Sequence, residues 1–162
     1  MPVVEIRKDR EALTMTVVAQ FVAPVARVWA AYADPRQLER FWGPPQWPAT
    51  FVRHDFAVGG RSEYYMTGPN GEQSRGFFEF LKVEGPRMFE VRDGFLGKDG
   101  KPTEGMPTMR IQFTFEPHDG GTRMVTVTTF PSLEAFEQVL GMGMEEGMRL
   151  AMGQIDAVLA AA

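Results

Sequence analysis

Six strand-like segments follow one another between residues 49 and 130, and no helix-like segment separates them. In the clearest of these segments, apolar side chains alternate with polar ones, which is the period of a strand that buries one face. The apolar members of that segment are Met109, Ile111, Phe113 and Phe115. Since parallel strands need long crossover connections, usually helices, this uninterrupted run predicts an antiparallel sheet.

Helical patterns flank this run on both sides. Before it, a strand-like segment that begins at about residue 13 leads into two short helices, whose starts are marked by Pro24 and by Asp34-Pro35. After it, Pro131-Ser132 opens a helical segment of about 29 residues, roughly 43 Å long. The order predicts an α+β fold, in which a curved, seven-stranded antiparallel sheet wraps around one long C-terminal helix, with two short helices between strands 1 and 2.

Length and composition narrow the choice of partners and compartment. The chain has 162 residues and no cysteine, which predicts a single domain over 1–162, with a core at about 13–160, and neither disulfides nor a thiolate metal cluster. The net charge of −4 is interspersed and leaves no basic patch for nucleic acid. No stretch has the apolar length of a membrane span or a signal peptide. We expect a cytoplasmic protein without nucleic-acid partner or membrane insertion, and a homodimer stays open.

Two glycines bear on whether a cavity lies beneath the predicted C-terminal helix. Gly143 and Gly147 lie in its apolar stripe, although a glycine inside a helix costs about 1 kcal/mol relative to alanine. They either let the sheet pack closely or leave room for a ligand, and an apolar pocket is the usual ligand site of such a fold. The stripe as a whole consists of Leu133, Phe136, Leu140, Gly143, Met144, Gly147, Leu150, Ala151, Ile155 and Val158.

The predicted ligand-binding residues come from the strands, from the region of the two short helices and from the C-terminal helical segment. The segment FWGPPQWPA, residues 41–49, is too rich in proline for a helix or a regular strand, so its tryptophans either plug one end of the cavity, contact a ligand or form an interface. Of the adjacent Tyr64 and Tyr65, Tyr64 is expected to face inward because it shares the parity of Met66. The predicted ligand-binding residues are Trp29, Trp42, Trp47, Tyr64, Met66, Phe78, Phe80, Met109, Ile111, Phe113, Leu140, Gly143, Met144, Gly147 and Met148.

Catalytic and metal-binding signals are weak in this sequence. His54 and His118 are far apart, and no zinc-protease, nucleophile-elbow or phosphate-loop motif is present. Glu90 and Arg92 share one face of a predicted strand, where they either form a charge pair inside the fold or meet solvent. We therefore assign no catalytic residue, no metal ligand and no cofactor, and we leave enzymatic activity open.

Several motifs resemble those of a known family. DPRQLERFWGP, DFAVGG, GPNGE, RGFFEF and GMEEGM occur in that order within about residues 13 to 160. Together they resemble the homology domain named after the activator of a heat-shock chaperone's ATPase, within the START-like, birch-pollen-allergen-like superfamily (SRPBCC). The resemblance implies a helix-grip fold. The sequence departs from the family at Met148 and Ser62, where aromatic residues are common, and both departures change the expected pocket.

The resemblance and the residues suggest three functions. The superfamily implies a carrier, sensor or sequestering protein that binds a small hydrophobic or aromatic molecule in an internal cavity between sheet and C-terminal helix, without a cofactor. The family's name suggests a chaperone ATPase-interacting co-chaperone module, which we discount because the chain has room for this domain alone. A polyketide cyclase or aromatase-like enzyme, or a self-sacrificing resistance protein, would need polar groups in the pocket. Ligand binding is the function we expect.

Overall fold

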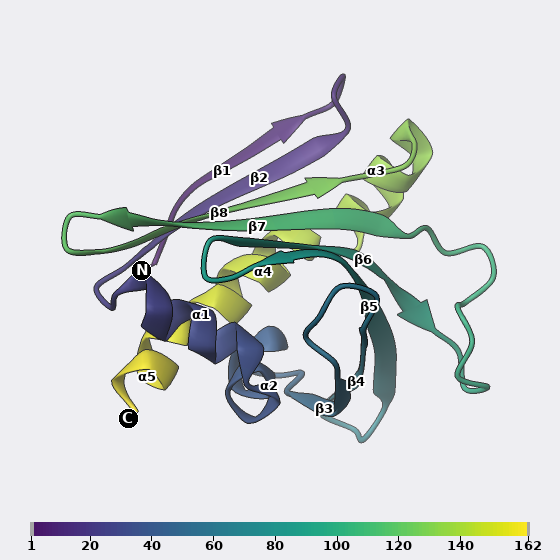
Figure 1. The fold of residues 1–162 in the computed structure, drawn as a ribbon. Coiled ribbons are helices and arrows are strands. Elements are labelled where there is room, and N and C mark those ends of the chain that lie inside the picture. Colours follow the sequence, from purple (N-terminus) through teal and green to yellow (C-terminus); the bar gives the residue numbers. More distant parts are fainter. Residues whose placement is uncertain (1, 162) are drawn as a thin grey trace.

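The computed structural model describes residues 2–161, which form one curved antiparallel sheet and five helical segments (Figure 1). Eight strands follow the order β1-β2-β8-β7-β6-β5-β4-β3, and the sheet curves over the helices in a helix-grip-like arrangement. The predicted α+β class and antiparallel sheet are confirmed. The strands are β1 (Val3–Asp9), β2 (Thr14–Phe21), β3 (Ala49–His54), β4 (Arg61–Thr67), β5 (Gln73–Glu84), β6 (Met88–Leu96), β7 (Met109–His118) and β8 (Gly121–Thr129).

The prediction of seven strands is wrong, because β1 adds an eighth at the edge of the sheet. Its sequence VVEIRKD lacks a regular apolar alternation, and only Val3 is buried within it. An edge strand with most of its side chains in solvent carries no periodic signal, so the pattern that revealed the other strands is missing here. β1 pairs with β2 and also reaches the last helical region, where Lys8 Nζ lies 2.6 Å from Glu145 Oε1.

The two predicted short helices are present between β2 and β3. They are α1 (Val25–Ala33) and α2 (Pro35–Trp42). Asp34 caps α2 as expected: its side chain accepts a hydrogen bond from the Arg36 backbone N–H at 2.9 Å, and Pro35 occupies the first helical turn. Trp42 therefore stands at the C-terminal end of α2, where its direction is set by the helix.

The inward face of β7 also agrees with the prediction. Met109, Ile111, Phe113 and Phe115 are all buried, whereas Arg110 forms an ion pair with Glu90 on the outer face of the sheet. The sheet was expected to wrap around the C-terminal helix, but part of this inward face packs against another element. The rings of Phe113 and Phe115 lie 5.5 and 5.6 Å from that of Tyr32 in α1, so the short helices cover part of the sheet that the sequence assigned to the C-terminal helix.

The expected long C-terminal helix is confirmed in part, but it begins later than predicted. α4 (Met144–Met152) and α5 (Ile155–Ala160) follow each other over 17 residues through the right-handed backbone of Gly153 and Gln154, whereas α3 (Leu133–Gly141) is a separate segment. Gly143 has a φ of 89°, and this left-handed backbone ends α3 and redirects the chain into α4. The bend also changes the apolar stripe: Leu133 and Leu150 are 42% and 47% exposed. Within residues 2–161, no helix has the length and apolarity needed to cross a membrane.

The break between α3 and α4 can be tested with two alanine variants. Gly143→Ala should lower the free energy of unfolding by about 1 kcal/mol, because a side chain is strained in the left-handed conformation. Gly141→Ala is the control: a Cβ on this exposed glycine at the end of α3 would have no surrounding atom within 4 Å, so the variant should gain up to about 1 kcal/mol. Denaturant unfolding measures both. Stabilisation by both alanines would indicate an unbroken helix and contradict this description.

Candidate functional site

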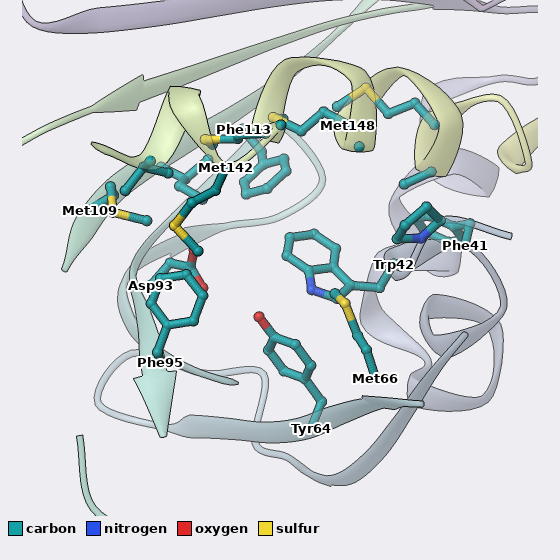
Figure 2. A pocket seen from close by; sticks show the side chains of 18 of the residues that line it. Phe41, Trp42, Tyr64, Met66, Asp93, Phe95, Met109, Phe113, Met142 and Met148 are labelled. Atoms are coloured by element: carbon teal, nitrogen blue, oxygen red, sulfur yellow. The ribbon is translucent and has the colours of Figure 1, made fainter. Parts of the chain in front are cut away.

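A cavity of about 300 Å³ lies between the sheet and the junction of α3 and α4 (Figure 2). This volume is at the lower end of the range of roughly 300 to 1,000 Å³ that is usual for ligand pockets. Side chains from β4, β6 and β7, from both short helices and from α3 and α4 meet around it. Its lining consists of Tyr32, Phe41, Trp42, Pro44, Tyr64, Met66, Asp93, Phe95, Met109, Ile111, Phe113, Val139, Met142, Gly143, Met144, Gly147, Met148, Ala151 and Met152.

Most of the predicted ligand-binding residues line this cavity. Their spacing along separate strands and helices was enough to place most of them on one surface, because these residues are on the inward faces of their elements. Their role in binding stays a prediction. The predicted residues that line the cavity are Trp42, Tyr64, Met66, Met109, Ile111, Phe113, Gly143, Met144, Gly147 and Met148.

Five predicted residues lie outside the lining. Trp29 and Phe80 belong to a densely packed aromatic cluster, in which the Trp29 ring lies 5.5 Å from that of Phe115. Phe78 supports the site from behind, since its ring is 4.8 Å from that of Trp42 and nearly perpendicular to it. Leu140 instead lines a separate surface pocket together with Lys8. The fifth, Trp47, is described with the segment that contains it.

The two tryptophans of FWGPPQWPA have different environments. Gly43 allows the chain to fold back, because a Cβ there would lie 2.0 Å from the Trp47 carbonyl oxygen. Gln154 Nε2 secures this turn by donating to the Gly43 carbonyl at 2.7 Å. Trp42 lines the cavity, while Trp47 lies outside it and packs over Gly68, so close that a Cβ on that glycine would lie 2.7 Å from the indole ring. The stiff segment therefore fixes one tryptophan in the cavity wall.

Tyr64 brings a hydroxyl group to the cavity. It pairs across the sheet with Gly76, and a Cβ at Gly76 would lie only 2.5 Å from the Tyr64 hydroxyl oxygen. The absence of a side chain at position 76 thus gives the tyrosine ring its place over β5. Figure 2 shows the hydroxyl directed into the open space below Trp42. Burial and the nearby charge of Asp93 raise the pKa of Tyr64 well above its ordinary value, so the phenol stays protonated at neutral pH.

Asp93 is the acidic group of the cavity, and sequence reasoning missed it. It shares the inward parity of Phe89 and Val91 on β6, and this acid on an apolar strand face was the signal that could have found it. Glu90 and Arg92, the charge pair suggested by the sequence, lie on the outer face. There Arg92 Nη1 is 3.4 Å from Glu79 Oε2. The Oδ1 atom of Asp93 is buried and has no hydrogen-bond partner among the described residues.

The environment of Asp93 penalises its negative charge. Burial raises the pKa of Asp93 to about 7, and the Tyr64 side chain and the Gly94 backbone N–H oppose this rise. The other titratable residues of the lining are Tyr32 and Tyr64, and burial raises the pKa of each. No lysine, arginine or histidine is among the described residues that line the cavity. Asp93 is consequently the group that changes charge near neutral pH in this site.

His54 connects neighbouring elements through hydrogen bonds at both of its ring nitrogens. Its Nε2 lies 3.0 Å from the Tyr32 carbonyl oxygen and its Nδ1 lies 2.7 Å from Ser62 Oγ. Because a carbonyl oxygen only accepts, Nε2 carries the proton and Nδ1 accepts from the serine hydroxyl. Burial lowers the pKa of His54, which favours this neutral form. Ser62 stands where an aromatic residue was expected, and its hydroxyl forms a hydrogen bond with His54. Among residues 2–161, no three His, Asp or Glu side chains are grouped as a metal site requires.

The buried carboxylate predicts a distinctive pH dependence of stability. An unfolded aspartate has a pKa near 3.9, so between about pH 4 and pH 7 the folded protein binds the extra proton and its stability falls as pH rises. Asp93→Asn removes this penalty. The stability advantage of the variant over the parent should be small near pH 4 and widen by up to about 1.4 kcal/mol per pH unit until about pH 7.

Urea unfolding at pH 5 and pH 8 measures this advantage, and contributions from His54 cancel because both proteins contain it. Asp156→Asn is the matched control, since Asp156 is exposed on α5. An advantage of Asp93→Asn that is equal at the two pH values would show that Asp93 is not a penalised buried acid.

Comparisons with known proteins agree with this architecture. The sequence profile of the family described as "Activator of Hsp90 ATPase homolog 1-like protein" matches residues 22–160. The crystal structure of protein Ms6760 from Mycobacterium smegmatis is 49% identical in sequence, with 99% of each chain covered and a TM-score of 0.92. A protein from Arthrobacter aurescens, solved by NMR, is also 49% identical, with 98% of this chain and 92% of that chain covered and a TM-score of 0.93.

A more distant structure extends the likeness of the fold. The AHSA1 protein from Silicibacter pomeroyi is 18% identical, with 91% of this chain and 98% of that chain covered and a TM-score of 0.73, which shows a shared fold alone. No match was found among curated proteins. The profile over residues 22–160 and the two structures at 49% identity confirm the resemblance seen in the sequence motifs, and the chain belongs to the Activator of Hsp90 ATPase homolog 1-like family.

Proposed function

We propose that this protein binds a small apolar or aromatic molecule in the cavity between its sheet and the α3–α4 junction, as a carrier, sensor or sequestering protein. The observation that carries the proposal is an apolar cavity of about 300 Å³ that opens to solvent between the sheet and the helices, beside the packed core. Because protein interiors are close-packed, an apolar hollow of this size next to the core calls for an explanation. A space lined mainly by aromatic and aliphatic side chains with a few polar groups is the usual form of a ligand site.

Gly147 supports this proposal from the helical side. A Cβ at Gly147 would have no atom of the surrounding structure within 4 Å, so the glycine is not there to let the sheet approach closely. It faces the same space as Met144 and Met148, whose flexible thioether side chains adapt to ligands of different shape. Of the two explanations that the sequence left open for this glycine, the open space favours room for a ligand.

Met142 marks the opening of the cavity to solvent. It follows α3 directly and lines the cavity, although its side chain is 59% exposed. An exposed methionine at the rim is an apolar surface that a ligand can contact before it enters. The rim therefore lies at the α3–α4 junction, where the left-handed Gly143 redirects the chain.

Binding has more support than catalysis at this site. Proton transfer during catalysis needs an acid or base whose pKa is near neutral, and a reacting partner for it. Asp93 meets the first condition, but the other titratable groups among the described lining residues are tyrosines that stay protonated. One carboxylate and two tyrosine hydroxyls in an otherwise apolar cavity suit recognition of a ligand that carries a single polar group.

Filling the cavity at Gly147 tests the proposed function. Gly147→Leu should leave the fold intact and gain roughly 1 kcal/mol of helix propensity, because its side chain extends into open space. The variant should bind the neutral dye N-phenyl-1-naphthylamine at least about tenfold more weakly than the parent, a loss of about 1.4 kcal/mol. Dye fluorescence measures the affinity. Thermal unfolding with dye at 100 times its dissociation constant should show about 2.7 kcal/mol of stabilisation in the parent.

Gly147→Ala is the matched control, since it gains helix propensity and fills little of the space. It should bind the dye like the parent. Two results would contradict the proposal: a leucine variant that binds the dye as well as the alanine variant does, or one that melts well below the parent without dye, which is the sign of an overpacked core.

A further inference from the structure

The cavity lining carries a negatively charged group that no positively charged side chain of the described lining balances. Asp93 contributes a carboxylate whose Oδ1 atom is buried and has no hydrogen-bond partner among the described residues. No cationic side chain is among the described residues of the lining to neutralise it. Buried polar atoms in folded proteins are nearly always paired, and an unpaired one calls for an explanation such as a missing ligand.

The rest of the wall is suited to a positive charge. The rings of Trp42 and Tyr64 lie at 76° to one another with centroids 6.1 Å apart, and the Tyr64 side chain is close enough to Asp93 to lower the pKa of that carboxyl as a hydrogen-bond partner. The faces of tryptophan and tyrosine attract cations, most strongly where water is excluded. Asp93, Trp42 and Tyr64 thus form one part of the wall of an otherwise apolar cavity, which suits a group that is both charged and apolar.

We propose that the ligand of this cavity is a small apolar amine, whose protonated nitrogen donates to the Asp93 carboxylate while its hydrocarbon or aromatic body fills the space between Trp42, Tyr64 and Met148. This inference rests on the proposed ligand-binding function and names the chemical class that the site selects. The volume of about 300 Å³ limits the ligand to a small body and leaves out long acyl chains.

The energetics of Asp93 agree with this ligand class. Burial raises the pKa of Asp93 to about 7, so the ligand-free fold disfavours a charge at this position. An ammonium group beside the carboxylate favours the charged form and lowers that pKa. Amine binding therefore displaces a proton from Asp93 when the pH is below about 7. A carboxylic acid ligand meets the opposite effect, because its charge would add to that of Asp93 in an apolar space.

Three probes with the same aromatic body separate these cases: 1-naphthylmethylamine, the neutral 1-naphthylmethanol and the anionic 1-naphthoate. Isothermal titration calorimetry at pH 7.5 gives each affinity for the parent and for Asp93→Asn. The parent should bind the amine at least about tenfold more tightly than the alcohol, since hydrogen bonds between charged partners are the stronger kind, and the acid most weakly. Asp93→Asn should lose the preference for the amine, so that its affinities for the amine and the alcohol differ by less than about twofold.

A second readout is the pH dependence of amine binding. The affinity of the parent for the amine should rise from pH 6 to pH 8, as the proton on Asp93 is lost, and that of Asp93→Asn should not. Tyr32 and Tyr64, the other titratable groups of the lining, stay protonated throughout this range. Gly147→Leu locates the binding, because it should weaken both the amine and the alcohol.

The results distinguish the two proposals. If the parent binds the alcohol as tightly as the amine, or if Asp93→Asn keeps the amine preference, the amine inference is wrong and the ligand-binding function stands. If the parent binds none of the three probes, the proposed function fails and the amine inference fails with it. A preference of the parent for the amine that disappears in Asp93→Asn supports both proposals.

Discussion

The left-handed backbone at Gly143 is the constraint on which the site depends. A continuous C-terminal helix would lie against the sheet along its whole length, whereas the turn at φ 89° ends α3 and starts α4 in a new direction. Residues of both segments line the cavity: Val139 and Met142 in and directly after α3, and Met144, Gly147 and Met148 in α4. The space between them is not filled, because the curved sheet cannot follow both helices closely.

Rigid supports around the cavity keep the space open. The aromatic cluster behind it includes Phe89 and Phe113, whose stacked rings lie 4.4 Å apart, and His54 joins α1 to β4 through both ring nitrogens. Glycines at positions 43 and 76 allow close approaches of the backbone and of the Tyr64 ring. These contacts fix Trp42 and Tyr64 in place before any ligand arrives, which reduces the entropy lost on binding.

The sequence predicts the inward faces well and the interruptions poorly. Alternation placed Tyr64 and Phe113 correctly, and the capping signal at Asp34-Pro35 located α2. β1 has no alternation of apolar and polar side chains because it is a solvent-exposed edge strand. The break at Gly143 could not be told from a glycine inside a helix, because a helical wheel assumes a straight helix axis. Asp93 was missed for another reason. Opposite charges on Glu90 and Arg92 drew attention to the outer face, whereas parity with Val91 marks Asp93 as the inward acid.

The methionine methyl groups offer the most direct measurement of the central claim, that a ligand occupies this cavity. Met66, Met109 and Met148 line it, while Met15 and Met124 are fully buried elsewhere in the core. In NMR spectra of protein with ¹³C-labelled methionine methyl groups, titration with 1-naphthylmethylamine should shift the signals of the first three and leave those of Met15 and Met124 in place. Shifts confined to methionines outside the lining, or no shift at saturating amine, would contradict the account.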